Sequence, residues 1–379
     1  MIPNRERMKR MRLFEFVVPP LAVVLCLALV ESLFRALFPQ PVAVENNAYY
    51  IPDDHMGFRL MPNSEGSYFG HVPVKINEYG LRDDWVSKRK PPQMFRILCL
   101  GDSFTMGAGV RQEDSYPKVL EVLLRRQFPN TEVINAGVDG WDTPEYAEYF
   151  QREGMSFTPD LVLVGLFVGN DVYVDTTGQH ITAVNGRRVF AETATPGIWT
   201  RLKVLTYLHF HMARFIIGRQ AGEPLPFELE SNICDKTIKW LLAVQKSRLT
   251  NHELEHDRTV ARMGGCLAGL ERIATKAADA GAGLLVVIIP DLNQISPMVQ
   301  SKLLNQKMKL SFDWEMPQRV LRRELESRAI LYLDPLHSFE GKECLYNNHT
   351  HLTVAGNRLL AQEIYSYLQA SAWFRDKRQ

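Results

Sequence analysis

The sequence predicts a doubly wound α/β domain, a three-layer sandwich in which a mainly parallel, five-stranded sheet lies between helices, as in flavodoxin-like folds. Two observations lead to this prediction. Five short runs are rich in Val, Ile and Leu, which is typical of parallel strands buried on both faces. Segments with apolar residues at helical spacing alternate with them. The runs cover residues 95–100, 132–134, 160–166, 283–289 and 329–333.

Helices are expected between and after these strands. Val119, Leu120, Leu123 and Leu124 recur at helical spacing after the first strand. The last helix is expected to place its apolar residues on one face toward the core. The predicted helices cover residues 117–128 and 143–153, a segment that ends near Ala280, and a segment that begins near Val354.

One connection is much longer than the others. Residues 172–282 separate the third and fourth strands, whereas a crossover needs only about a dozen residues. The interval must therefore hold an insertion, and we expect an amphipathic helix over 199–217 within it. Because it follows a strand, the insertion would emerge at the carboxyl edge of the sheet, where it either covers a site or serves packing alone.

The amino terminus has the pattern of a membrane-targeting segment. Basic residues precede an uncharged run over 16–30, and an apolar helical face continues to Phe38. No Ala-x-Ala site follows, which favours an uncleaved anchor over a signal peptide, although Pro19 and Pro20 would kink its first half. The basic flank predicts a cytoplasmic amino terminus, so the protein is expected to cross the inner membrane once with its remainder in the periplasm. The basic residues are Arg5, Lys9, Arg10 and Arg12.

The chain therefore divides into three predicted parts. Residues 1–38 form a cytoplasmic tip and membrane anchor. Residues 39–94, rich in Pro, Gly and Asn, form a linker with small β-structure. Residues 95–372 form the α/β domain with its insertion.

Composition excludes several classes of protein. The chain has 379 residues, of which 46% are hydrophobic and 23% charged, which argues against disorder. Lys and Arg number 44 against 43 for Asp and Glu, so no basic field favours a nucleic-acid partner. Five widely spaced cysteines form no CxxC pair, which predicts neither a disulfide framework nor a cysteine metal site.

Chemistry is expected where the strands end, because open α/β sheets bind ligands outside the carboxyl ends of their strands. Ser103, Gly140 and Asn170 lie in the turns after the first three strands. They supply a hydroxyl nucleophile, an approachable backbone N–H and a side-chain amide, which together suit acyl transfer through an oxyanion. His351 lies between the last strand and the last helix, at the same edge, where it would serve as the base.

These residues resemble the SGNH hydrolases, also called the GDSL esterase and lipase family. The resemblance implies that Ser103 is the nucleophile, that His351 is the general base, and that the N–H groups of Ser103 and Gly140 with the Asn170 amide form the oxyanion hole. It implies no metal or organic cofactor. The match covers roughly 95–370, and residues 76–82 resemble the segment before the catalytic domain in membrane-anchored bacterial members. The matching blocks are Gly101-Asp102-Ser103, the turn at Gly140, Gly169-Asn170-Asp171, and His351 to Gly356.

The sequence departs from the family beside the base. Family members usually carry an Asp three residues, sometimes two, before the histidine, where it orients the ring and stabilises imidazolium. Here these positions are Asn348 and His349, neither of which supplies a negative charge. Two alternatives follow. Either the amide oxygen of Asn348 orients His351, or an acid elsewhere, such as Asp334 or Glu343, replaces the missing one.

Several of these residues have structural readings as well. Ser103 taken alone is typical of a helix N-cap, and Asp102 and Asp171 are typical of turns and helix starts. His349 reads as a solvated loop residue or an alternative base. His209 and His211 would diverge on a helix, which argues against a metal site there.

We therefore expect a membrane-anchored serine esterase or O-acyltransferase that acts on an extracytoplasmic acylated glycan or lipid. Hydrolysis and transfer share an acyl-enzyme and differ in the acceptor. The competing hypothesis is a catalytically silent glycan-binding or envelope-assembly module with the same fold, since the triad acid is missing.

Overall fold

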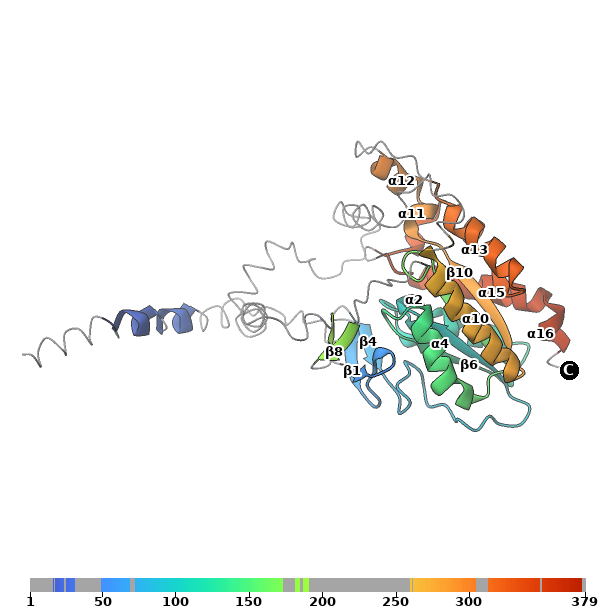
Figure 1. Cartoon of the computed structure of the whole chain (residues 1–379), viewed down its shortest axis with the longest axis horizontal. Coiled ribbons are helices and arrows are strands. Elements are labelled where there is room, and N and C mark those ends of the chain that lie inside the picture. The colour runs from blue at the N-terminus through green and yellow to red at the C-terminus, as the bar shows by residue number, and fades with distance from the viewer. Residues whose placement is uncertain are drawn as a thin grey trace, which may run out of the picture. The chain divides into compact units, whose positions relative to one another are not determined.

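The structure is a computed structural model in which the chain divides into two units, residues 1–44 with 195–228 and residues 45–194 with 229–379. The residues that it describes are 16, 18–23, 25–30, 49–68, 72–172, 181–184, 187–190, 260, 262–304, 313–347 and 350–376. The α/β fold belongs to the second unit (Figure 1).

Five parallel strands form the central sheet, in the order β11-β10-β7-β5-β6. Strand β5 comes first along the chain and lies inside the sheet, with β6 on one side and β7, β10 and β11 on the other, as in flavodoxin-like folds. The predicted five-stranded parallel sheet is confirmed. The strands are β5 (Phe95–Gly101), β6 (Thr131–Gly137), β7 (Leu161–Phe167), β10 (Gly283–Ile289) and β11 (Leu331–Leu333).

Helices cover both faces of this sheet. Successive residues of β5 point to opposite faces, so Leu98 and Leu100 belong to one hydrophobic cluster, and Ile97 and Cys99 to the other. The first cluster includes residues of α4 (Thr143–Arg152), α10 (Gly264–Asp279) and α13 (Met316–Ser327), and the second includes residues of α3 (Tyr116–Arg125) and α15 (Val354–Ala370). Figure 1 shows α4 and α10 side by side. The four predicted helices are confirmed, and α13 was not predicted.

Short elements complete the connections. The helices are α2 (Ser103–Met106), α11 (Leu292–Ile295), α12 (Pro297–Leu304), α14 (Leu336–Phe339) and α16 (Ala372–Asp376), and the 3-10 turns are η1 (Gln112–Asp114), η2 (Gly154–Phe157) and η3 (Glu343–Leu345).

Antiparallel hairpins precede the α/β domain. Strand β1 (Tyr50–Asp53) pairs with β2 (Gly57–Leu60), and β3 (Glu65–Tyr68) pairs with β4 (Val72–Lys75). We call these two pairs the upstream hairpins. Their buried residues, among them Phe58, share one hydrophobic cluster with β5, so hairpins and sheet form a continuous core.

A third hairpin comes from the insertion. Strands β8 (Ile181–Val184) and β9 (Arg187–Phe190) pair with each other, and both contact β1. The sequence did not predict this hairpin. The helix expected over 199–217 lies outside the described residues.

The segment after the upstream hairpins is anchored by a buried arginine. Arg82 is fully buried, and its guanidinium donates to the carbonyls of Met106, Gly107 and Val110 at 2.6 to 3.0 Å. A fourth bond, of 3.3 Å, reaches the carbonyl of Pro73. Arg82 therefore links the upstream hairpins to the loop that follows α2.

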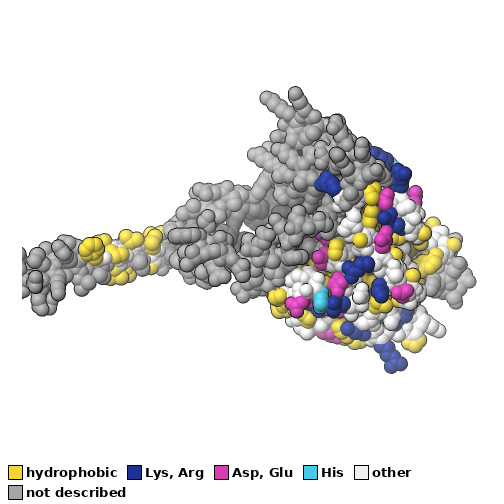
Figure 2. Space-filling view, in the orientation of Figure 1, with side chains coloured by type: hydrophobic (Ala, Val, Ile, Leu, Met, Phe, Trp, Pro, Cys, Tyr) yellow, Lys and Arg dark blue, Asp and Glu magenta, His cyan; other side chains and the backbone are white. Residues whose placement is uncertain are grey.

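The predicted membrane anchor is only partly described, because residues 17, 24 and 31–38 lie outside the described residues. Residues 16, 18–23 and 25–30 are helical, and Phe16, Leu25 and Leu29 are exposed; Figure 2 shows this stretch as hydrophobic. Within the described ranges, no helix combines the length and the apolar character needed to cross a bilayer.

Candidate active site

Three contacts join the turns that the sequence singled out. His351 Nε2 lies 2.9 Å from Ser103 Oγ. The Asn170 amide donates to Asp102 Oδ2 at 3.3 Å, and the N–H of Val138 donates to the carbonyl of Gly101 at 2.9 Å. Segments that are far apart in the sequence therefore meet at one edge of the sheet, as parallel strand ends must.

Glycines let the short helix α2 lie directly on the sheet. Gly101 pairs with Gly137 of β6 and with Gly165 of β7. A Cβ atom at Gly137 would lie 2.3 Å from the backbone nitrogen of Met106, and one at Gly165 would lie 2.5 Å from Thr105 Oγ1. Only glycine permits this approach, which sets Ser103 at the carboxyl edge. We call Gly101, Gly137 and Gly165 the glycine cradle.

Ser103 is free of the capping role that its position alone would indicate. The N-cap of α2 is Asp102, whose Oδ1 accepts a hydrogen bond from the N–H of Phe104 at 2.8 Å. This confirms the structural reading of Asp102. The hydroxyl of Ser103 faces His351 instead, and the Ser103 side chain is buried.

Backbone bonds and aromatic rings hold His351 in place. The backbone N–H of His351 donates to Asn347 Oδ1 at 3.1 Å. The imidazole lies 5.2 Å from the ring of Phe104 and 6.4 Å from that of Tyr68, measured between centroids. Phe104 in turn stacks on Phe167 at 3.9 Å. The imidazole thus lies among packed aromatic side chains.

The structure describes only some of the residues proposed to orient the imidazole of His351. Asn348 and His349 lie outside the described residues. Asp334 pairs with Arg322 at 3.4 Å and caps Leu336, and Glu343 accepts a hydrogen bond from Ser296. Both carboxylates are therefore engaged in interactions that do not involve His351.

Two acidic side chains in the turns of the site, Asp102 and Asp171, are buried. Burial raises the pKa of Asp102 to about 7, against a usual value of 3.8, although hydrogen bonds from Phe104 and Asn170 oppose this shift. Burial also raises the pKa of Asp171, which accepts bonds from the N–H of Phe167 and the hydroxyl of Tyr146. Near neutral pH, Asp102 is thus divided between its charged and neutral forms.

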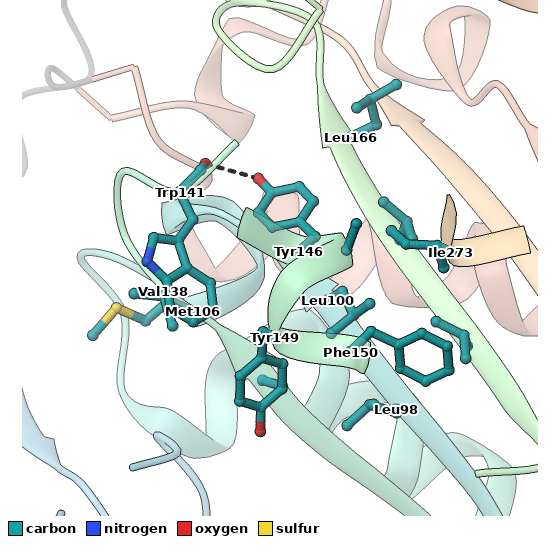
Figure 3. Packing of buried hydrophobic residues seen from close by; sticks show 14 of the residues in the cluster. Leu98, Leu100, Met106, Val138, Trp141, Tyr146, Tyr149, Phe150, Leu166 and Ile273 are labelled. Carbon is teal, nitrogen blue, oxygen red and sulfur yellow. Dashed lines mark hydrogen bonds between the residues drawn. The ribbon is translucent and has the colours of Figure 1, made fainter. Parts of the chain in front are cut away.

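Gly140 lies in a turn that is firmly anchored. Its φ of 83° is in the left-handed region, which glycine adopts without strain. The next residue, Trp141, is buried, and its indole N–H donates to the carbonyl of Phe58 at 2.9 Å. Figure 3 shows Trp141 packed near Val138 and Met106, and its carbonyl accepting a bond from Tyr146. We call residues 138–142 the Gly140 turn.

The site also contains residues that sequence reasoning missed. Tyr50 and Tyr68, from the upstream hairpins, both donate their hydroxyls to Asp139 Oδ2, at 3.3 and 2.9 Å. Asp139 directly precedes Gly140, so its place in the turn was a signal that could have been used. Nothing in the sequence marks Tyr50 or Tyr68 as part of this site, because they are separated from Asp139 by 89 and 71 residues.

The solved structures that match this chain include esterases and a lipase. A catalytic mutant of Axe2, an acetylxylan esterase from Geobacillus stearothermophilus, is 12% identical, with a TM-score of 0.36, over 73% of this chain and 95% of that one. The acetyl xylan esterase AlAXEase is 15% identical, with a TM-score of 0.36, over 72% and 99%. The lipase Lip_vut3 from a goat rumen metagenome is 10% identical, with a TM-score of 0.40, over 72% and 97%.

The sequence of the chain identifies its family. No curated protein matches the chain. The model of the GDSL-like lipase/acylhydrolase family matches residues 99–359, a span that contains Ser103, Gly140, Asn170 and His351. Since this match extends over more than half of the 379 residues, the chain belongs to the GDSL-like lipase/acylhydrolase family.

Proposed function

We propose that this protein is a serine esterase or O-acyltransferase that carries its acyl intermediate on Ser103. The observation that carries the proposal is the distance of 2.9 Å between Ser103 Oγ and His351 Nε2. A hydroxyl within hydrogen-bond reach of an imidazole, on a serine whose side chain is buried, is the arrangement that activates a serine nucleophile.

The proposed reaction has two halves. As Ser103 Oγ attacks the ester carbonyl, His351 Nε2 takes its proton, and the carbonyl electrons move onto oxygen. The N–H groups of Ser103 and Gly140 and the amide of Asn170 stabilise that oxyanion. Its collapse breaks the bond to the leaving alkoxide, which takes the proton from His351. Water, or an acceptor hydroxyl, then attacks the acyl-enzyme carbonyl while His351 Nε2 takes its proton. Collapse of this second intermediate breaks the bond to Ser103 Oγ, which takes the proton back from His351.

We propose that a neutral group, the side-chain amide of Asn348, orients the imidazole of His351. Asn348 stands where the family usually has its Asp, and its amide oxygen would accept the N–H of the ring. An amide compensates imidazolium charge less well than a carboxylate does. We therefore expect slower turnover than in relatives that carry the acid.

The substrate is proposed to be an acylated glycan or lipid outside the cytoplasm, with the protein held at the inner membrane. Support for the membrane location comes from the basic residues before residue 16 and from the exposed hydrophobic side chains of Phe16, Leu25 and Leu29. Such a stretch favours contact with lipid.

Covalent labelling tests this function. The purified protein is treated with a fluorophosphonate probe, and hydrolysis of p-nitrophenyl acetate is followed in parallel. We expect wild type to be labelled and Ser103→Ala to lose labelling and at least about a thousandfold in kcat. Ser156→Ala, at an exposed serine whose hydroxyl donates to the nearby carbonyl of Glu153, is the matched control and should behave as wild type.

The result that would contradict the enzyme is also clear. A folded wild type that takes no label and hydrolyses no ester, but binds an acylated glycan, would support the silent binding module instead. That alternative is favoured by Asn348 and His349 standing where the family usually has an acid.

A further inference from the structure

The upstream hairpins hold the Gly140 turn at three points. Tyr50 and Tyr68 donate to the carboxylate of Asp139, and the carbonyl of Phe58 accepts the indole N–H of Trp141. Asp139 and Trp141 are the two neighbours of Gly140 in the sequence. The position of the proposed oxyanion donor therefore depends on residues that lie outside the segment matched by the family.

Tyr68 also contacts the base. Its ring meets the imidazole of His351 nearly at right angles, 76° between planes, with centroids 6.4 Å apart. Tyr68 is only 5% exposed, and Asp139 only 7%. One buried side chain therefore touches the base through its ring and the Gly140 turn through its hydroxyl.

We propose that Tyr68 is a positioning residue that sets the distance between His351 and the Gly140 turn. This inference rests on the function proposed above. Tyrosine has only two side-chain torsions, so a hydroxyl fixed on Asp139 also fixes the plane of the ring against His351. The side chain of Tyr68 then holds both His351 and the Gly140 turn in fixed positions.

The geometry explains why such a group matters here. A hydrogen bond to a buried carboxylate is stronger than one between neutral groups, which makes the Tyr68–Asp139 link stiff. Displacement of a catalytic group by about 1 Å can cost about a hundredfold in rate. The ring of Phe104 contacts His351 as well, so Tyr68 and Phe104 together limit how the imidazole can turn.

Two matched substitutions separate positioning from packing. Tyr68→Phe and Tyr50→Phe each remove one hydroxyl from the same oxygen of Asp139. We expect Tyr68→Phe to lower kcat for p-nitrophenyl acetate about tenfold, with KM within about twofold of wild type. Tyr50→Phe, which removes the longer bond and leaves the His351 contact intact, should lower kcat less than about threefold. The two variants should lose similar stability to urea.

A double-mutant cycle adds a readout that a structural role alone would not move. Asp139→Asn removes the charge that accepts the hydroxyl of Tyr68. If one link carries the effect, the double variant Tyr68→Phe with Asp139→Asn should lower kcat no further than the more severe single variant does. Multiplied effects would show two independent roles and overturn the proposal.

The remaining outcomes keep this inference separate from the function on which it rests. Absence of turnover in wild type contradicts the proposed function, whatever the role of Tyr68. Full kcat in Tyr68→Phe, beside an active wild type, overturns the positioning role alone. Equal losses of kcat in the two Tyr→Phe variants would assign Tyr68 to packing, and a rise confined to KM would assign it to substrate contact. Both results also overturn the proposal.

Discussion

Burial of the Asp102 carboxyl group links the stability of the protein to pH. Burial raises its pKa from 3.8 to about 7 in the folded state. Between these values the folded state binds more protons than the unfolded chain does, so the free energy of unfolding falls as pH rises. The contribution is fully present below about pH 4 and is lost as pH rises toward and past 7.

Asp102→Asn should flatten this pH dependence. The amide oxygen can still cap the N–H of Phe104, but the side chain no longer ionises. We expect urea unfolding between pH 4.5 and 7.5 to show a slope less negative than that of wild type, by up to ~1.4 kcal/mol per pH unit. Asp114→Asn, at a more accessible carboxylate, is the control. Identical slopes for wild type and Asp102→Asn would refute the buried, protonated Asp102.

At the level of elements, the position of helix α2 depends on the glycine cradle. A Cβ at Gly165 would lie 2.5 Å from Thr105 Oγ1 and 2.6 Å from the hydroxyl of Tyr116. Gly165→Ala should therefore destabilise the protein by about 1–3 kcal/mol through overpacking. It should also lower kcat, because α2 must move and Ser103 moves with it.

The control for this prediction is Gly264→Ala. Gly264 is the first residue of α10, and a Cβ there meets nothing within 4 Å. That variant should stay within about 0.5 kcal/mol of wild type in chemical denaturation. Equal stability of the Gly165→Ala and Gly264→Ala proteins would show that α2 does not need the close approach.

At the scale of the whole molecule, two arginines join the upstream hairpins to the α/β domain in different ways. Arg82 is fully buried against four carbonyls, whereas Arg59 forms a partly exposed ion pair with Glu153. Arg82→Met would leave buried acceptors without a donor and should cost about 3 kcal/mol or more. Arg59→Met should cost about 0–1 kcal/mol.

Urea denaturation followed by circular dichroism and tryptophan fluorescence tests this contrast. Because hairpins and sheet share one core, we expect the two probes to report one common transition in wild type. Comparable losses for the two variants, or separate transitions in wild type, would mean that the hairpins are not integral to the domain.

Continuous apolar runs were sufficient to predict the sheet, because a strand buried on both faces leaves few polar residues in its sequence. Helix α13 was missed because its apolar residues, Val320, Leu321 and Leu325, are diluted by charged neighbours. The β8–β9 hairpin was missed because strands of four residues give too short a pattern to distinguish from a loop.

The residues of the site likewise divide into those that the sequence predicts and those that only the fold reveals. Ser103, Gly140, Asn170 and His351 could be chosen from the sequence alone, since each lies in a turn that chain connectivity places at the carboxyl edge of the sheet. The role of Tyr68 could not be predicted, because its contact with Asp139 arises from the docking of a hairpin onto the domain. Docking depends on how side chains distant in sequence fill a shared core, and only the folded chain brings them together.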